Sequence, residues 1–280
     1  MKAGTAVVLG PGGPVGTAWL AGLAAGLRRA GVDLGAAGLI VGTSAGAVVG
    51  AILASGGDLD RLAAPRPAAG PGGGVRTDAV KLAEVLAALG NPGLDRADAV
   101  RLAGQLAIDA ATGREDAAIT RMRSLIGVTQ WPDRPLLIPA VDAGSGEPVI
   151  WDRLGPASLP EAVAASTAFP ATAPPITIGG RRYIDGALRD GTNIDLAADA
   201  AVLIVAEPAA HLFGPGRATA AGATVIRLVP DAAAINAFGP DLTGFATWEP
   251  AYQAGIRQAP DAAQAIRART RRFRDGAPIP

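Results

Sequence analysis

A serine between two glycines, near the start of the chain, constrains the fold more than any other feature. Residues 42–46 read Gly-Thr-Ser-Ala-Gly, a G-x-S-x-G pattern with Ser44 at its centre. An apolar run precedes the pattern at residues 38–41, and small and apolar residues follow it to residue 54. This context predicts a strand, a sharp turn and a helix. Such a turn strains the serine backbone and pushes its hydroxyl outwards, where the positive end of the helix stabilises a nearby anion.

The composition narrows the classes of function. A chain of 280 residues with 49% hydrophobic residues is long enough for one large domain with an ample core. The 25 basic and 25 acidic residues balance, so nothing favours a nucleic-acid partner. The absence of cysteine and the single histidine exclude disulfides, thiol nucleophiles and histidine-rich metal sites. We therefore expect a globular domain that holds no metal and no cofactor.

Two uncharged stretches, residues 3–27 and 34–57, are long enough to suggest membrane spans. Each has a glycine-containing turn in its middle, so we interpret each as a strand followed by a helix, because buried parallel strands are equally apolar. The first stretch also lacks the basic start and the cleavage region of a signal peptide. We therefore expect a cytoplasmic protein.

The order of the predicted elements indicates an α/β fold. Strands are expected at residues 5–9 and 39–41, and each is followed by a helical pattern, the first of them over residues 17–29. This alternation favours a mostly parallel, doubly wound central sheet with helices on both faces. Further strands are expected at residues 136–142, 147–152, 176–178, 182–184, 201–206 and 224–228. A short helix is expected at residues 159–166.

Residues 57–130 interrupt this alternation. The segment begins as a loop rich in Pro and Gly and becomes rich in Ala and Leu with helical periodicity. We expect a single domain over residues 1–280 with a helical insertion or cap at about residues 57–130, and ordinary covering helices are the alternative.

A last helix is expected from about residue 247. Its end is basic, and we interpret it as solvated, with contact to an anionic membrane surface as the alternative; the arginines are Arg267, Arg269, Arg271, Arg272 and Arg274.

A second glycine cluster follows the first predicted strand. Residues 10–16 read Gly-Pro-Gly-Gly-Pro-Val-Gly. Backbone N–H groups between a strand and a helix can converge on an anion. The spacing of Gly10, Gly12 and Gly16 occurs in some dinucleotide-binding loops, but the second strand does not end in the acidic residue that such a site requires. A nucleotide loop is therefore the weaker alternative.

A serine nucleophile needs a base, and two residues are candidates. His211 is the only histidine and lies in a predicted loop after Pro208, so we interpret it as a solvated loop residue, with a Ser-His-Asp triad as the alternative. Asp185 ends an apolar strand and precedes Gly186, which places its carboxylate at the sheet edge where Ser44 is expected. Asp-Gly pairs are also common turns, and local sequence alone favours that interpretation.

Taken in order, these features resemble the patatin-like phospholipase family, in its bacterial branch. Each motif is modest, but four of them in order, with matching spacing, are specific, and the resemblance spans residues 5 to about 205. Asn193 also resembles the asparagine that follows the last motif in the family. The matching motifs are the glycine-rich loop at 10–16, the G-x-S-x-G at 42–46, the Ala-Ser-Thr-Ala-Phe-Pro segment at 165–170 that leads to Pro174 and Pro175, and the D-G-[GA] motif at 185–187.

The resemblance implies a three-layer α/β/α fold and a serine acyl hydrolase. Such an enzyme cleaves carboxylic esters of lipids through a Ser-Asp dyad and an acyl-enzyme intermediate, without a cofactor. Ser44 is then the nucleophile and Asp185 the base, and the expected partner is a lipid or another acyl ester. The implied oxyanion hole consists of the N–H groups of Gly12, Gly13 and Ala45. The other motif glycines support these turns and are Gly10, Gly16, Gly42, Gly46 and Gly186.

The glycine loop departs from the family pattern G-G-G-x-[RK]-G in two places. Pro11 stands at the first glycine and has no N–H to donate, and Val15 stands at the basic position. After the last motif, Asn193 is followed by Ile194 rather than by proline. The alternatives are an acyltransferase or thioesterase with the same dyad, or a lipid-binding protein without catalysis.

Overall fold

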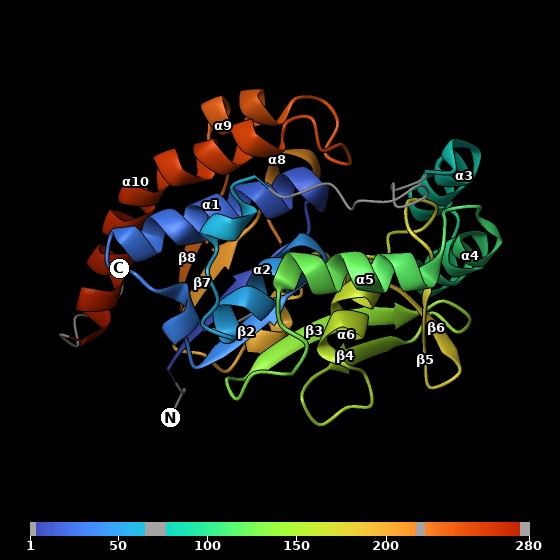
Figure 1. Cartoon of the computed structure of the whole chain (residues 1–280), viewed down its shortest axis with the longest axis horizontal. Coiled ribbons are helices and arrows are strands. Elements are labelled where there is room, and N and C mark those ends of the chain that lie inside the picture. Colours follow the sequence, from blue (N-terminus) through green and yellow to red (C-terminus); the bar gives the residue numbers. More distant parts are fainter. Residues whose placement is uncertain (1–3, 65–76, 217–221, 275–280) are drawn as a thin grey trace.

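The computed structural model describes residues 4–64, 77–216 and 222–274, which fold around one eight-stranded sheet (Figure 1). The strands are β1 (Thr5–Leu9), β2 (Leu39–Gly42), β3 (Leu136–Asp142), β4 (Pro148–Trp151), β5 (Ile176–Ile178), β6 (Arg181–Asp185), β7 (Val202–Ala206) and β8 (Thr224–Leu228). Their order is β5-β6-β3-β2-β1-β7-β8, and β4 also pairs with β3. The run from β3 to β8 is parallel, whereas β4, β5 and β6 are antiparallel to their neighbours. The mostly parallel α/β sheet predicted from the sequence is therefore confirmed.

Helices surround this sheet, and the helices predicted after β1, after β2 and at residues 159–166 are present. They are α1 (Gly13–Arg29), α2 (Ala45–Ala54), α3 (Ala79–Leu89), α4 (Arg96–Asp109), α5 (Glu115–Ile126), α6 (Leu159–Ser166), α7 (Ala187–Asp190), α8 (Ala210–Phe213), α9 (Ala232–Phe238) and α10 (Trp248–Arg274). Short 3-10 turns lie at Leu34–Ala36, Asp60–Leu62 and Ile194–Ala197. Helix α1 begins four residues earlier than predicted, because Pro14 is favourable in a first helical turn.

Both faces of the sheet are buried, as expected for central parallel strands. Alternate side chains of β1 point to opposite faces: Val7 and Leu9 join the larger core with α1, α2, α6 and α10, and Ala6 and Val8 join a smaller core with the 3-10 turn Ile194–Ala197. Helices α4 and α7 cover the same second face at β3 and β6. Figure 1 shows α1 and α10 lying along each other above the sheet. Helices and turns therefore cover the parallel strands on both faces of the sheet.

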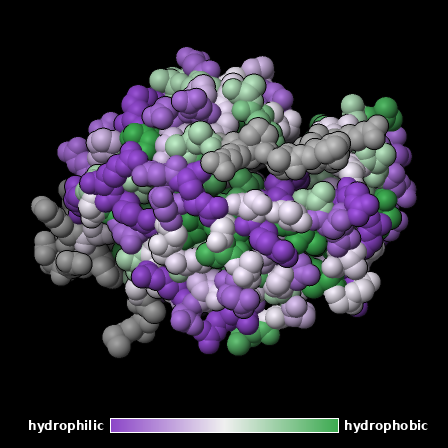
Figure 2. Space-filling model, in the orientation of Figure 1, coloured by the Kyte–Doolittle hydropathy of each residue, from purple (hydrophilic) through white to green (hydrophobic). Residues whose placement is uncertain are grey.

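The expected insertion at about residues 57–130 corresponds in part to α3, α4 and α5; residues 65–76, which include much of its predicted loop, lie outside the described residues. That this segment is a cap stays a prediction. Apolar side chains are exposed on α3, at the upper right of Figure 2, where Val80 is 70% and Leu86 is 55% exposed. None of the described helices has the length and apolar character that a membrane span requires.

The basic end of α10 is partly tied to the rest of the protein. Arg267 donates to the carbonyl of Ala30, and Arg269 Nη1 donates to the carbonyl of Val225 at 2.7 Å. The side chains from residue 271 onwards lie outside the described part. Contact of this tail with an anionic membrane surface stays a prediction.

Candidate active site

Ser44 lies on the sharp turn between β2 and α2, as the sequence predicts. Its backbone has φ 53° and ψ −114°, a left-handed conformation that strains a residue with a side chain. The flanking glycines are required by close approach. A Cβ at Gly42 would lie 2.5 Å from the carbonyl oxygen of Gly46, and a Cβ at Gly46 would lie 2.0 Å from that of Leu9. Glycine at position 42 therefore lets the turn close on itself, and glycine at position 46 lets it fit against the end of β1.

Asp185 ends β6, and its carboxylate meets the Ser44 hydroxyl. Ser44 Oγ donates to Asp185 Oδ2 at 2.7 Å, although the two residues are 141 positions apart. The other carboxylate oxygen, Oδ1, accepts the N–H of Ala187 at 2.8 Å. Gly186 is needed here as well, because a Cβ there would lie 2.1 Å from the carbonyl oxygen of Pro139. Ser44 is 6% and Asp185 is 2% exposed, so the pair is nearly sealed from solvent.

Burial changes the acidity of this carboxyl group. Desolvation raises the pKa of Asp185 from 3.8 to about 7, and the hydrogen bonds from Ala187 and Ser44 only partly oppose this shift. A carboxyl group with a pKa near neutral is a far better proton acceptor than an exposed one, because a general base works best when its pKa lies near the operating pH.

The segment after α6 supports both members of the pair. Ser166 Oγ accepts the backbone N–H of Ser44 at 3.1 Å, and Ser166 is fully buried. Two residues further on, the carbonyl of Ala168 accepts the backbone N–H of Asp185 at 3.0 Å. The sequence showed this segment only as one motif of a resemblance. Its contacts join positions far apart in the chain, so only the order of motifs hinted at its place here.

The glycine loop lies against the serine turn. Gly46 N–H donates to the carbonyl of Gly10 at 3.2 Å, which joins the two glycine motifs directly. Among the hydrogen bonds of residues 4–64, 77–216 and 222–274, the N–H groups of Gly12, Gly13 and Ala45 donate to no acceptor. These donors lie at the starts of α1 and α2, where helix dipoles favour negative charge. That these three N–H groups form an oxyanion hole stays a prediction.

The structure accounts for one of the two unusual residues of this loop, Val15, and shows what remains beside the other, Pro11. Val15 is fully buried in the main core, and its N–H donates to the carbonyl of Leu242 at 3.4 Å. A basic side chain at this position would have to leave that core. Pro11 removes one possible donor but leaves Gly12 and Gly13, and Pro14 lies within the first turn of α1.

Valine at Gly13 is expected to lower turnover by at least about 100-fold, the usual cost of losing one oxyanion donor. Gly13 has φ +61°, and a Cβ there would lie 2.6 Å from the carbonyl oxygen of Leu242. The side chain therefore meets the Leu242 backbone and turns the N–H away, rather than simply filling a pocket. Steady-state kinetics with a soluble ester measure the loss.

Gly179→Val is the matched control, because Gly179 has φ +59° but nothing within 4 Å of an added Cβ. This variant should keep wild-type turnover. Wild-type turnover in Gly13→Val would exclude the loop from the oxyanion hole, and tight binding of a dinucleotide would support the nucleotide alternative.

His211 is not the solvated loop residue that the sequence suggested. It lies on the short helix α8, is half-buried, and packs edge-on against Phe238 of α9 with ring centroids 5.9 Å apart. The prediction was wrong because α9, which supplies Phe238, was not anticipated. Among the described residues, the Nδ1 of His211 has no hydrogen-bond partner, and no hydrogen bond joins it to Ser44 or Asp185.

No cluster of acidic or histidine side chains in this described part could hold a metal ion.

Comparison with known proteins gives a family and a distant structural likeness. The sequence model of a family described as "Patatin-like phospholipase" matches residues 7–198, well over half of the chain. No curated protein gives a significant sequence match. Among solved structures, the chain is similar to VipD from Legionella pneumophila, with 12% identity and a TM-score of 0.46, over 94% of this chain and 67% of that chain.

Proposed function

Because the chain belongs to the patatin-like phospholipase family, we propose that it is a serine acyl hydrolase that cleaves the carboxylic esters of lipids through Ser44 and Asp185. One observation carries this proposal: the buried hydrogen bond of 2.7 Å from Ser44 Oγ to Asp185 Oδ2. A nucleophile and a base within hydrogen-bond reach, at the start of a helix, are what acyl transfer requires.

The first half of the reaction forms an acyl-enzyme. Ser44 Oγ attacks the ester carbonyl carbon while its proton passes to the ionised carboxylate of Asp185. The carbonyl oxygen becomes an oxyanion, and the N–H groups of Gly12, Gly13 and Ala45 are the donors that stabilise it. When the carbon–oxygen bond to the alcohol breaks, the alcohol takes the proton from Asp185 and leaves.

The second half releases the acid. Water attacks the carbonyl carbon of the acyl-enzyme and gives a proton to Asp185, and the oxyanion forms again among the same donors. The bond to Ser44 Oγ then breaks, Ser44 recovers its proton from Asp185, and the carboxylic acid departs. One carboxyl group thus serves as base and then as acid in each half.

The rate of hydrolysis is expected to rise with pH through a midpoint near 7. Burial raises the pKa of Asp185 from 3.8 to about 7, so below this pH the carboxyl is protonated and cannot accept the Ser44 proton. The measurement is kcat/KM for a soluble ester over about pH 5–9, with circular dichroism as the control for folding. A rate that stays constant down to about pH 5 would mean that Asp185 keeps an ordinary pKa or is not the base.

A panel of esters with varied acyl chains, together with fluorophosphonate labelling, tests the function itself. Hydrolysis of the panel with labelling at Ser44 supports the proposal. Labelling with acyl transfer to an added alcohol or thiol, in place of water, would instead indicate an acyltransferase. Lipid binding with neither labelling nor turnover would indicate a lipid-binding protein without catalysis.

A further inference from the structure

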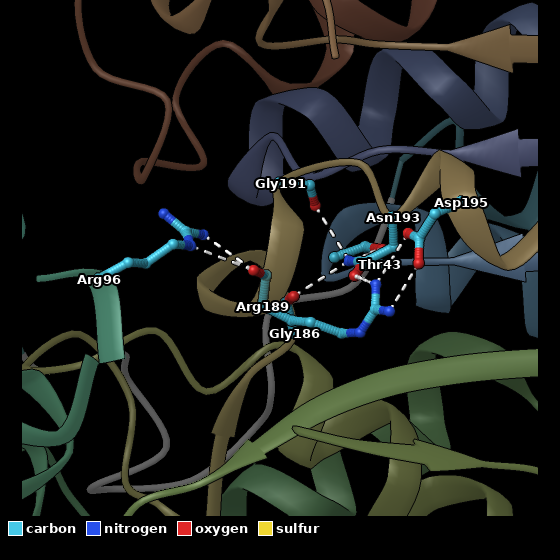
Figure 3. Close-up of polar contacts among 7 residues, drawn as sticks. All are labelled: Thr43, Arg96, Gly186, Arg189, Gly191, Asn193 and Asp195. Carbon is cyan, nitrogen blue, oxygen red and sulfur yellow. Dashed lines mark hydrogen bonds and ion pairs between the residues drawn. The ribbon is translucent and has the colours of Figure 1, made fainter. Parts of the chain in front are cut away.

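Asn193 joins the two turns that carry Ser44 and Asp185. Its Nδ2 donates to Thr43 Oγ1 at 3.0 Å and to the carbonyl of Gly186 at 3.0 Å. Thr43 is the residue before Ser44, and Gly186 is the residue after Asp185. Figure 3 shows the amide lying between these groups, with the carbonyl of Gly191 as a third acceptor at 3.2 Å. A single buried amide therefore touches both turns.

The sheet itself gives no direct connection between these turns. Ser44 follows β2 and Asp185 ends β6, and β3 lies between these two strands in the sheet. The separation of the two turns therefore depends on the contacts made beyond the strand ends. The Asn193 amide is such a contact, and it adds to the bonds that Ser166 and Ala168 make with the backbone N–H groups of Ser44 and Asp185.

Asparagine suits this position in its backbone and in its side chain. Asn193 is fully buried and has φ 57° and ψ 41°, a left-handed conformation that asparagine adopts more readily than most residues. Its NH₂ group supplies two donors toward oxygen atoms, while its Oδ1 accepts from Arg189 Nη1 at 2.9 Å. An aspartate in its place would turn an oxygen toward the oxygens of Thr43 and Gly186.

Arg189 fixes the orientation of the amide. Its guanidinium forms two hydrogen bonds with the carboxylate of Asp195, at 2.8 and 2.6 Å, in addition to the bond with Asn193 Oδ1 (Figure 3). A guanidinium that bonds a carboxylate through two nitrogens has a defined orientation. The amide oxygen of Asn193 is therefore held toward Arg189 and the amide nitrogen toward the two turns. On the other side, Arg96 of α4 donates to the carbonyls of Leu188 and Arg189, which secures the same turn from outside.

From these contacts we infer that Asn193 is a positioning residue that holds Ser44 and Asp185 at the distance needed for proton transfer. The inference rests on the proposed function. Asn193 touches neither reacting oxygen and acts through Thr43 and Gly186. A displacement of about 1 Å in a catalytic group can cost about 100-fold in rate, so loss of this bridge should appear in the chemical step.

Asn193→Gly tests this role, because glycine keeps the left-handed backbone and removes only the amide. We expect kcat to fall about 100-fold while KM stays close to the wild-type value. The rate of fluorophosphonate labelling at Ser44 should fall in parallel. Asn193→Asp is the second variant: it keeps the shape and the acceptor for Arg189 but has no donor, and it should show the same loss of kcat.

Tyr252→Phe is the matched control. It removes the hydrogen bond from Tyr252 Oη to Asp60, which measures 2.8 Å and joins α10 to the turn Asp60–Leu62. This variant should lose stability without loss of kcat. If kcat fell in Tyr252→Phe in proportion to its Tm, a general loss of stability would explain the Asn193 variants, and the positioning role would be overturned. Wild-type kcat and labelling in both Asn193 variants would overturn it equally.

A crystal structure of Asn193→Gly separates this inference from the proposed function. We expect the distance from Ser44 Oγ to Asp185 Oδ2 to exceed its value of 2.7 Å. An unchanged distance would overturn the positioning role, whether or not the enzyme is active. Conversely, a wild-type protein that neither hydrolyses esters nor reacts with fluorophosphonate would overturn the proposed function, while the crystallographic distance would still decide the role of Asn193.

Discussion

Ser44→Ala is expected to abolish ester hydrolysis and fluorophosphonate labelling. Removing the nucleophile of a serine hydrolase lowers kcat by on the order of 10⁶-fold, because only binding and the oxyanion donors remain. The fold should persist, since Asp185 keeps its hydrogen bond from Ala187 and the turn keeps the bond from Ser44 N–H to Ser166. The measurement is turnover of a soluble ester by pure variant protein, with circular dichroism to confirm folding.

Ser55→Ala is the matched control, because Ser55 caps the other end of the same helix, α2. Among the described residues, its hydroxyl has no hydrogen-bond partner, so its removal should leave turnover unchanged. Substantial turnover in folded Ser44→Ala would show that another group forms the acyl-enzyme, and the proposed role of Ser44 would be lost.

The parts of the fold that were predicted from the sequence are those set by local patterns. The run of apolar residues in β2, followed by glycine and a small-residue helix, was sufficient to place the serine turn at Ser44. The Ala-Gly-Ser-Gly segment, residues 143–146, similarly indicated the hairpin between β3 and β4. In both cases the signal lies in a short continuous stretch of sequence, where periodicity and turn chemistry are informative.

The short helices were missed for two different reasons. Helices α7 and α8 have four residues each, which is too short for a 3.6-residue period to be visible. Helix α9 had a usable signal: the Asp231 side chain caps it by accepting the N–H of Ala234. That omission led to the wrong expectation for His211, whose ring packs against Phe238 of this helix.

The candidate site depends on contacts that no local pattern shows. Local sequence favoured Asp185 as an ordinary turn residue, and only the resemblance to a family paired it with Ser44. The contacts of Ser166 and Asn193 with the serine turn span 122 and 150 positions, so their functions emerge only when the strands are assembled. The raised pKa of Asp185 likewise reflects burial by the whole fold, which spacing alone does not reveal.

Asp185→Asn is expected to lower kcat by on the order of 10⁴-fold. Replacing the aspartate of a Ser-His-Asp triad by asparagine has an effect of this size. Asparagine keeps the shape of the side chain but cannot take the Ser44 proton. His211→Ala is the control and should keep most activity, because His211 packs against Phe238 and makes no hydrogen bond to Ser44 or Asp185 among those described. If His211→Ala were as damaging as Ser44→Ala, with folding intact, a Ser-His-Asp triad would replace the dyad.

The same Asp185→Asn variant should be more stable than the wild type at pH 8. The direction of this change in stability distinguishes loss of the base from disrupted packing as the cause of lost activity. Burial raises the pKa of Asp185 from 3.8 to about 7, so the folded wild type must ionise a buried carboxyl that ionises without cost when unfolded. The protonated Asp185 carboxyl therefore contributes stability below about pH 4. This contribution is lost as the pH rises to about 7, a difference of at most about 4 kcal/mol in the free energy of unfolding. The neutral amide avoids this cost. A Tm at pH 8 below that of the wild type would mean that the variant loses activity through disrupted packing, and that its kinetics do not report on the base.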